Sequence, residues 1–190
     1  MDMSVAEDDI PIPAWDAAGN FQPMGKLAVH RQGLRHPAVS VLVLRGQEML
    51  IQRRAAGKYH TPGLWANTCC THPSWGEAAA DCARRRLREE LGITGLDLRH
   101  VGQAEYRAEV PGIDGPMIEH EVVEVFVAKA PGPVQITPDS DEVAETRWVS
   151  LDALRDEIAQ SPQAFTPWLR IYLEKHAKMI FGDLAASRPV

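Results

Sequence analysis

One helix constrains the fold of this 190-residue chain more than any other segment. Within Gly76–Leu91 an alanine or leucine recurs every four positions, which places an apolar stripe along one side of a helix. Gly92 follows at the position where a glycine commonly ends a helix. Such a stripe has to be buried against another layer. The segments on both sides of the helix are predicted to be strands, so that layer is expected to be a sheet.

The strand-like and helical segments around this helix predict an α+β chain. Strands on both sides of one central helix, with helices added at the end, indicate α/β/α layering with a mixed sheet. The predicted strands are Ile10–Trp15 and Phe21–Val29, flanking a turn at residues 16–20, then Pro37–Leu44, Glu48–Arg53, Leu96–Val110, Ile118–Ala128 and Arg147–Val149. The predicted C-terminal helices are Leu151–Gln160 and Pro167–Met179.

Charge and cysteine usage exclude several classes of protein. Twenty Lys and Arg against 26 Asp and Glu give a net charge of −6, which offers no general attraction to nucleic acid or an anionic membrane. The first ten residues lack the layout of a signal peptide, and no apolar run approaches the roughly 20 residues that span a bilayer. Three cysteines make no disulfide framework, so we expect a reduced, cytoplasmic setting.

Two glutamates share one face of a predicted strand. Within Ile118–Ala128, the two-residue period places Glu119 and Glu121 on one face and His120 on the other. Neighbouring carboxylates on a half-buried face repel one another unless a cation or a shared proton lies between them. Taken alone, the pattern favours a solvated edge face.

Histidines provide a second set of candidate ligands. His30, His36 and His72 combined with carboxylates would suit Mn²⁺, Fe²⁺ or Zn²⁺, and oxygen-rich sets suit Mg²⁺. Their spacing matches no zinc-finger pattern, so the argument for a metal from spacing is weak. His60 and His100 are expected to be ordinary surface or satisfied core histidines.

Cys70 lies on a polar loop, two residues before His72. An unpaired cysteine commonly packs as a small hydrophobe, and that is our interpretation of Cys82 in the helix. For Cys70, a titrating acid, a nucleophile and a metal ligand also remain open.

Basic residues lie near the loop that leads into the Cys70 segment. Arg53 and Arg54 lie at the end of a strand, Lys58 follows in the loop after it, and Arg84–Arg86 lie on the central helix. Arginine and lysine converging on a pocket would bind a diphosphate through charge-assisted hydrogen bonds. The alternatives are an intrahelical ion pair between Arg86 and Glu90, and a plain solvated face for Arg84 and Arg85.

The segment Glu77–Ile93 resembles the Nudix box of enzymes that act on diphosphates. The matching residues are Glu77, Arg85, Leu87, Glu89, Glu90, Gly92 and Ile93. Thr71 replaces the glycine that begins the box, and Arg86 replaces a metal-binding glutamate that the hydrolases need. A guanidinium at that position removes a metal ligand and adds a phosphate-binding group, which disfavours hydrolysis.

Further segments make the resemblance more specific. The chain is similar to type 1 isopentenyl-diphosphate delta-isomerases over about Phe21–Tyr172, in these segments: Lys26–His30, Arg35–Ala38, Asn67–Pro73, Glu119–Glu121 and Phe165–Trp168. The resemblance implies a Nudix-like fold with a mixed sheet, a central Nudix helix and additional C-terminal helices. It also implies interconversion of isopentenyl and dimethylallyl diphosphate by a 1,3-shift of a proton, in isoprenoid biosynthesis.

The same resemblance implies a role for each site residue. Cys70 and Glu121 would be the acid/base pair, with Tyr106 hydrogen-bonded near Glu121 and Trp168 facing the hydrocarbon. A divalent metal, Mn²⁺, Zn²⁺ or Mg²⁺, would be bound by His30, His36, His72, Glu119 and Glu121. Glu90 would bind a Mg²⁺ together with the diphosphate. The diphosphate itself would contact Lys26, Arg54, Lys58 and Arg86.

We therefore expect one catalytic domain over residues 21–178, after an N-terminal tail and the start of a hairpin at 1–20 and before a C-terminal tail at 179–190. The expected partner is a small prenyl diphosphate rather than nucleic acid or a membrane, with the chain as a monomer or weak homodimer. Two other functions compete with the isomerase: a Nudix diphosphate hydrolase, and a non-enzymatic module that binds metal or a prenyl ligand.

Overall fold

The computed structural model describes residues 10–112 and 114–182, so the tail residues 1–9 and 183–190 lie outside the described part. Seven strands form a mixed sheet in the order β5-β4-β3-β8-β7, with β6 paired to β3 and β9 to β4. Only the central β3–β8 pair is parallel among the pairs described. The strands are β3 His36–Arg45, β4 Glu48–Arg54, β5 Trp65–Ala66, β6 Cys69–Thr71, β7 Arg99–Gly112, β8 Gly115–Lys129 and β9 Val143–Ser150.

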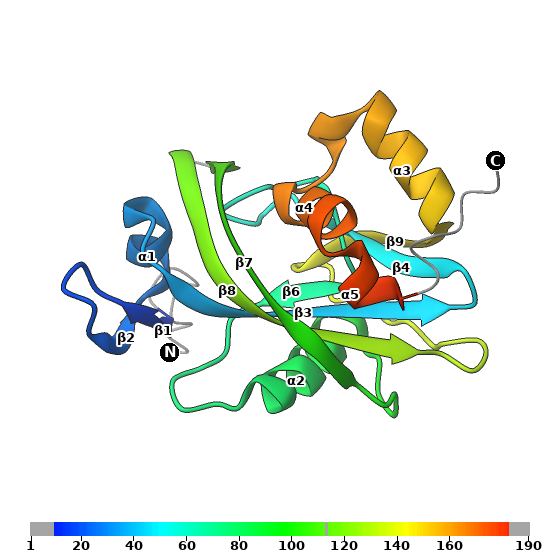
Figure 1. Cartoon of the computed structure of the whole chain (residues 1–190), viewed down its shortest axis with the longest axis horizontal. Helices are drawn as coiled ribbons and strands as arrows, with labels where there is room; N and C mark the ends of the chain where they lie inside the picture. Colours follow the sequence, from blue (N-terminus) through cyan, green and yellow to red (C-terminus); the bar gives the residue numbers. More distant parts are fainter. Residues whose placement is uncertain (1–9, 113, 183–190) are drawn as a thin grey trace.

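Helices cover both faces of this sheet, which confirms the predicted α/β/α layering (Figure 1). The central helix α2, Ala79–Leu91, buries its apolar stripe on one face with Val39, Val41 and Val43. The opposite face carries the C-terminal helices α3 Leu151–Gln160, α4 Pro167–Lys175 and α5 Ala177–Phe181.

The C-terminal end of α2 agrees with the prediction, but its first residue does not. The helix begins at Ala79 rather than Gly76, because the preceding residues form a turn in which the Glu77 amide donates to the Ser74 carbonyl. Gly92 adopts the left-handed conformation expected of a residue that ends a helix, with φ at +66°.

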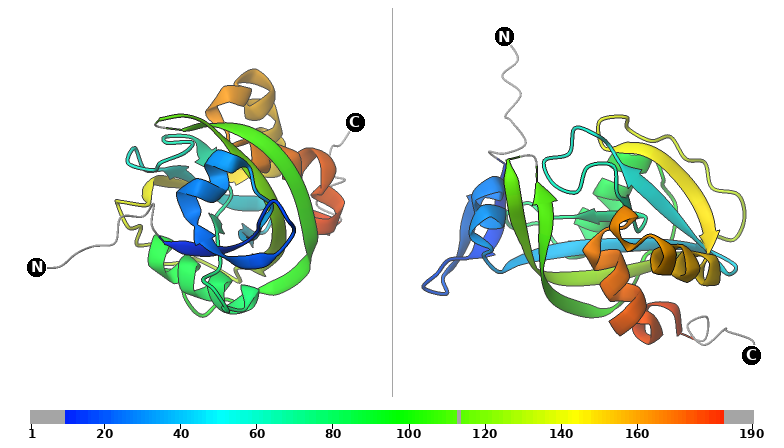
Figure 2. Two further views of the ribbon diagram at one scale, coloured as in Figure 1. Left: turned by 90° about the vertical axis from the view of Figure 1, so that its left-hand side faces the viewer. Right: turned by 90° about the horizontal axis from the view of Figure 1, so that it is seen from above.

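A separate hairpin precedes the sheet and is seen beside it in Figure 2. Strands β1 Pro11–Trp15 and β2 Phe21–Gly25 pair around a turn in which the Asp16 carboxylate accepts backbone hydrogen bonds. The predicted extension of this strand to Val29 is wrong, because the chain forms helix α1, Lys26–Gln32, instead.

Helix α1 replaces the predicted strand because its two buried residues face different neighbours: Val29 packs with Ile12 and Ala14 of the hairpin, and His30 contacts Glu119 of β8. Gly33 ends the helix at φ +63°, where a side chain would be strained, and an added Cβ would lie 2.9 Å from Ile118 on β8. This close approach brings His30, at the end of α1, over the sheet.

Other boundaries shift where pairing or packing extends an element. Strand β9 is longer than the predicted Arg147–Val149 because it pairs with β4 along its length. The predicted last helix divides into α4 and α5 at His176. Ile180 and Phe181 of α5 are buried in the core, while the division of the chain at residues 20 and 178 stays a prediction. None of the described helices is long and apolar enough to cross a membrane.

Candidate active site

A row of chemically active side chains crosses the middle of the sheet. The register places His36 of β3 opposite Glu121 of β8, and Glu121 opposite Tyr106 of β7. On the other side of β3, Ser40 lies opposite Cys70 of β6. Directly paired residues face the same side of a sheet, and residues four apart on one strand share that side. The pairing therefore assembles one row from four strands.

Three histidines and two glutamates converge at one end of this row. One potential ligand atom of each residue lies within 4.8 Å of all the others in the group His30, His36, His72, Glu119 and Glu121. This group is called the histidine–glutamate cluster below. His30 Nε2 is 3.3 Å from Glu119 Oε2, and His72 Nε2 is 3.1 Å from Glu121 Oε1.

The histidine–glutamate cluster has the hydrogen-bonding pattern of a cation site. Nδ1 of His30 is 2.7 Å from the Lys26 carbonyl and Nδ1 of His36 is 2.7 Å from the Leu34 carbonyl, so each Nε2 is directed inward. Within the described residues, His36 Nε2 and Glu119 Oε2 are buried without a hydrogen-bond partner. Buried polar atoms without partners are costly, and a bound divalent ion would satisfy both. These histidine and glutamate donors fit a divalent metal ion, but they do not distinguish Mn²⁺, Zn²⁺ and Mg²⁺.

The two carboxylates are not on a solvated edge face, so that interpretation of the strand pattern is wrong. Glu119 is 1% exposed and Glu121 is 3% exposed, because β8 lies between β3 and β7. Burial, with the neighbouring Glu119, raises the pKa of Glu121. Burial also acts against ionisation of Glu119, but His60 and His30 outweigh it and hold its pKa well below the usual value.

The acid/base candidates each have a hydroxyl partner. Tyr106 Oη donates to Glu121 Oε2 over 2.5 Å, as the expected position near Glu121 requires. Ser40 Oγ donates to Cys70 Sγ over 3.3 Å. Desolvation, together with the charge of Glu121, raises the pKa of the Cys70 thiol well above its ordinary value, so the sulfur carries its proton at neutral pH.

The aromatic candidate is fixed above the same region by α4. Trp168 is buried, and its Nε1 donates to Asn67 Oδ1 over 3.2 Å. The Arg54 guanidinium lies 5.6 Å from the centre of the Trp168 ring. Trp168 thus lies beside Arg54, a residue predicted to bind the diphosphate, on the face of the sheet that carries Cys70.

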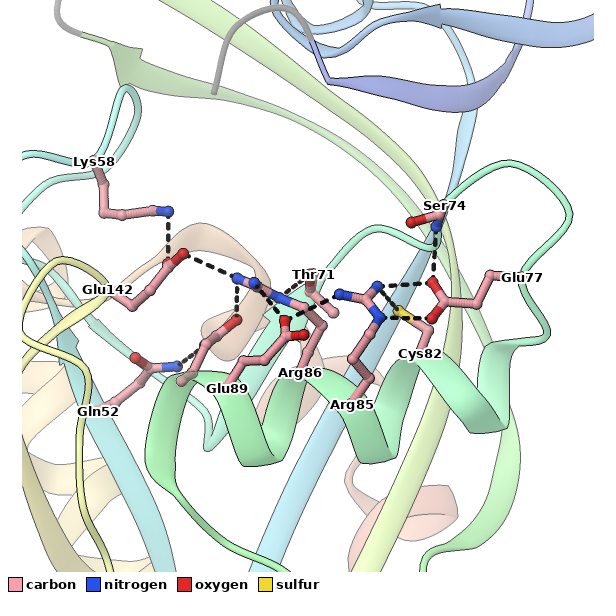
Figure 3. A network of polar contacts seen from close by, with 11 residues as sticks. Gln52, Lys58, Thr71, Ser74, Glu77, Cys82, Arg85, Arg86, Glu89 and Glu142 are labelled. Atoms are coloured by element: carbon pink, nitrogen blue, oxygen red, sulfur yellow. Dashed lines mark hydrogen bonds and ion pairs between the residues drawn. The ribbon is translucent and has the colours of Figure 1, made fainter. Parts of the chain in front are cut away.

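The predicted diphosphate ligands line one cavity with Cys70 and His72. They are Lys26, Arg54, Lys58 and Arg86, called the cationic cluster below. Arg86 donates to Glu90 over 2.9 Å and to Glu142 over 3.1 Å, and Lys58 Nζ is 2.7 Å from Glu142 (Figure 3). Gln52 donates to the other oxygen of Glu90, so this glutamate lies against the cationic cluster rather than in the histidine–glutamate cluster.

Two residues of the site were missed by sequence reasoning. His60 is a buried contact of Glu119, and its Nδ1 is 3.0 Å from Arg54, so it joins the two clusters. Burial lowers the pKa of His60 to about 4. The only signal in the sequence was its place in the loop between the strand ending at Arg54 and the Asn67–Pro73 segment. His100, by contrast, is half exposed beside Glu124, as expected.

Glu142 is the second missed residue, and no pattern around it marked it. It lies outside every quoted motif and reaches the site because its carbonyl accepts the amide of Ala55, next to the loop that carries Lys58. Of the other helix arginines, Arg85 pairs with Glu77 and Arg84 stays mostly exposed beside Asp81 (Figure 3 shows the Arg85 pair).

Known proteins share this arrangement of elements. A family model described as the NUDIX domain matches residues 34–169. A protein of Rhodobacter capsulatus named isopentenyl-diphosphate Delta-isomerase is 61% identical over 175 residues, which cover 92% of this chain and 97% of that protein. The chain belongs to the isopentenyl-diphosphate Delta-isomerase family of NUDIX-domain proteins.

Solved structures support the fold of this NUDIX chain. The Deinococcus radiodurans protein DR0079 superimposes with a TM-score of 0.66 at 14% identity, covering 85% of this chain and 96% of its own. A MutT NUDIX hydrolase of Burkholderia pseudomallei gives a TM-score of 0.56 at 23% identity, covering 74% and 97%. At these identities the comparison establishes the fold alone.

Proposed function

We propose that the chain interconverts isopentenyl diphosphate and dimethylallyl diphosphate, with Cys70 and Glu121 exchanging protons with the substrate from opposite sides. The observation that carries this proposal is the row across the sheet, in which the register of β6, β3 and β8 brings a protonated thiol and a buried carboxylate to one face. Close relatives with the isomerase name support the reaction.

The reaction explains why these groups are buried. An alkene is a weak base, and its protonation creates a tertiary carbocation that water would capture. Glu121 and Trp168 are at most 3% exposed, which keeps water from the place where the cation would form. We propose that Trp168 faces the hydrocarbon and stabilises the cation through its ring by about 1–2 kcal/mol.

Proton transfer balances across the two groups. In one direction the sulfur–hydrogen bond of Cys70 breaks as a carbon–hydrogen bond forms at the end of the double bond, and the carboxylate of Glu121 takes a proton from the allylic carbon on its other side. The reverse reaction exchanges these roles. After each turnover the two groups have exchanged protonation states, and resetting them through solvent introduces solvent hydrogen into the substrate.

We propose that the histidine–glutamate cluster binds one divalent ion, Mn²⁺, Zn²⁺ or Mg²⁺. When bound, the ion compensates the charge of the paired carboxylates and fixes the orientation of Glu121. Tyr106 holds the outer oxygen of the same carboxylate in place. We propose that Glu90, beside the cationic cluster, shares a Mg²⁺ with the diphosphate.

The cationic cluster is proposed to bind the diphosphate. Lys58 and Arg86 now share the carboxylate of Glu142, which shows that both side chains can meet on one anion. The guanidinium of Arg86 stands where a Nudix hydrolase needs a metal-binding carboxylate, which disfavours attack by water on phosphorus.

We further propose that the chain is a cytoplasmic monomer or weak homodimer. This proposal is compatible with the net charge of −6, the free cysteines and the absence of a membrane-spanning helix among the described residues.

Proton NMR of isopentenyl diphosphate with the purified protein and Mg²⁺ in D₂O tests the proposal. We expect dimethylallyl diphosphate to appear, deuterium to enter substrate and product, and no phosphate to be released. Cys70→Ala should nearly abolish turnover, whereas the matched control Cys82→Ala, in the buried face of α2, should leave it unchanged. Release of phosphate faster than isomerisation would establish a hydrolase, and metal uptake without proton exchange would indicate a binding module.

A further inference from the structure

Two buried hydroxyl groups stand in line behind the Cys70 sulfur. Ser40 Oγ is 3.3 Å from Cys70 Sγ, and Tyr172 Oη is 2.8 Å from Ser40 Oγ. Both Ser40 and Tyr172 are 0% exposed. They come from different layers, since Ser40 is on β3 and Tyr172 is on α4, and they are 132 positions apart in the sequence. Neither hydroxyl belongs to the proposed acid/base pair, metal ligands or diphosphate-binding residues.

The donors in this line have a defined direction. Ser40 has one hydroxyl hydrogen, which it donates to the sulfur. Tyr172 must therefore be the donor in its contact with Ser40, and the Asn67 amide adds a weaker donor to the same oxygen at 3.5 Å. Tyr172 therefore donates to Ser40 and Ser40 donates to the sulfur, an arrangement that stabilises a sulfur after it has lost its proton.

We propose that Ser40 and Tyr172 are positioning residues that act through Cys70: they fix the orientation of its thiol and stabilise the sulfur while it is deprotonated. This inference rests on the proposed function, in which the sulfur alternates between thiol and thiolate in either direction of the reaction. The S–H bond breaks and re-forms at Cys70 alone, and the two hydroxyls keep their own hydrogens.

The second acid/base group has a matching arrangement. Tyr106 donates directly to Glu121, as Tyr172 does to Cys70 through Ser40. The two tyrosine rings pack edge to face, with their centres 6.3 Å apart. Each acid/base group is thus held by one buried tyrosine, and the contact between the rings makes the two orientations depend on how α4 packs on β7.

The inference is tested with Tyr172→Phe and Ser40→Ala in the D₂O assay, with kcat and KM measured separately. Each variant is expected to lower kcat about tenfold to a hundredfold. KM should stay within about twofold, because neither hydroxyl touches the diphosphate end. If the two act as one chain, the double variant is no slower than the slower single variant, which is the sign of coupling. Ser40→Thr, which keeps the hydroxyl, should restore most of the rate lost in Ser40→Ala.

A matched control removes a buried hydroxyl that hydrogen-bonds only to backbone groups. Thr68 Oγ1 donates to the Leu50 carbonyl and accepts the Val43 amide, in the same sheet. Thr68→Val should lower the melting temperature and leave kcat within about twofold of the original.

Three results would overturn the inference: unchanged kcat in Tyr172→Phe, fully additive losses in the double variant, or an equal loss of kcat in Thr68→Val. If Ser40→Ala does not fold, Tyr172→Phe decides, because it keeps the ring that packs. Failure of the original protein to isomerise the substrate would overturn the proposed function instead, so the two failures are distinguishable.

Discussion

The two halves of the candidate site solve the problem of buried charge in opposite ways. The histidine–glutamate cluster leaves His36 Nε2 and Glu119 Oε2 buried without a hydrogen-bond partner among the described residues. In the cationic cluster, Arg86 is paired with the protein's own carboxylates, Glu90 and Glu142. The first half therefore has buried atoms that an outside cation would satisfy, whereas in the second half Lys58 and Arg86 are neutralised by carboxylates and Arg54 Nε alone is left without a hydrogen bond among the described residues.

This difference implies different ligands for the two halves. A site with unsatisfied buried atoms gains much from a resident ion and has a cost when that ion is absent. Lys58 and Arg86, which already share a carboxylate, can exchange it for a diphosphate with little net cost, which suits a substrate that must bind and leave. Four measurements test this contrast.

Glu121→Gln should have the largest effect, lowering kcat by about 10³-fold while the chain stays folded, because the variant loses both a base and a metal ligand. The measurement is deuterium incorporation in D₂O, with circular dichroism to check folding. Glu124→Gln, on the opposite face of β8, is the control and should keep its rate. Retained exchange in Glu121→Gln would remove this carboxylate from the proton shift.

Removing the metal should lower the free energy of unfolding by about 3 kcal/mol, the gain expected from an ion at about a hundredfold above its dissociation constant. Thermal unfolding with and without a chelator measures this, and we expect a drop in melting temperature of roughly 6–12 °C. Glu119→Gln should already have lost most of this metal dependence. An unchanged melting temperature in the original protein would show that its unsatisfied atoms need no ion.

His60→Phe should weaken binding of Mn²⁺ by about tenfold to a hundredfold, because His60 contacts Glu119 from outside the predicted ligand set. It should also raise KM, since His60 contacts Arg54 of the cationic cluster. Calorimetric titration with Mn²⁺ measures the first effect and steady-state kinetics the second. The exposed His100→Phe is the control. A change in only one of the two quantities would mean that His60 does not link the clusters.

Glu142→Gln should have the smallest effect, lowering KM by about threefold to tenfold with little change in kcat. Burial opposes ionisation of Glu142, but Lys58 and Arg86 keep its pKa low, so its negative charge competes with the diphosphate at neutral pH. Removing one such charge changes binding by about 1 kcal/mol. Glu145→Gln, beside the half-exposed Arg53, is the control. A higher KM in Glu142→Gln would mean that Glu142 holds the cations in place for the substrate.

Much of the local structure followed from the sequence. The helix Leu151–Gln160 was predicted at its observed bounds, and the two-residue period correctly placed Glu119 and Glu121 on one face. Such patterns are readable because neighbours along a strand or helix share a face for purely local reasons. The resemblance to the isomerase family supplied residues that proved to lie together, including the five members of the histidine–glutamate cluster.

Four features of the site depend on how distant parts of the chain pack together. The parallel pairing of β3 with β8 sets His36 beside Glu121, and no local pattern contains that register. His60, Glu142 and the Ser40–Tyr172 contact depend on the packing of loops and of α4 against the sheet. The sequence alone determined which side chains share a face, since that depends on backbone geometry over a few residues. Which faces meet depends on burying them together, and that was settled only when the whole chain packed.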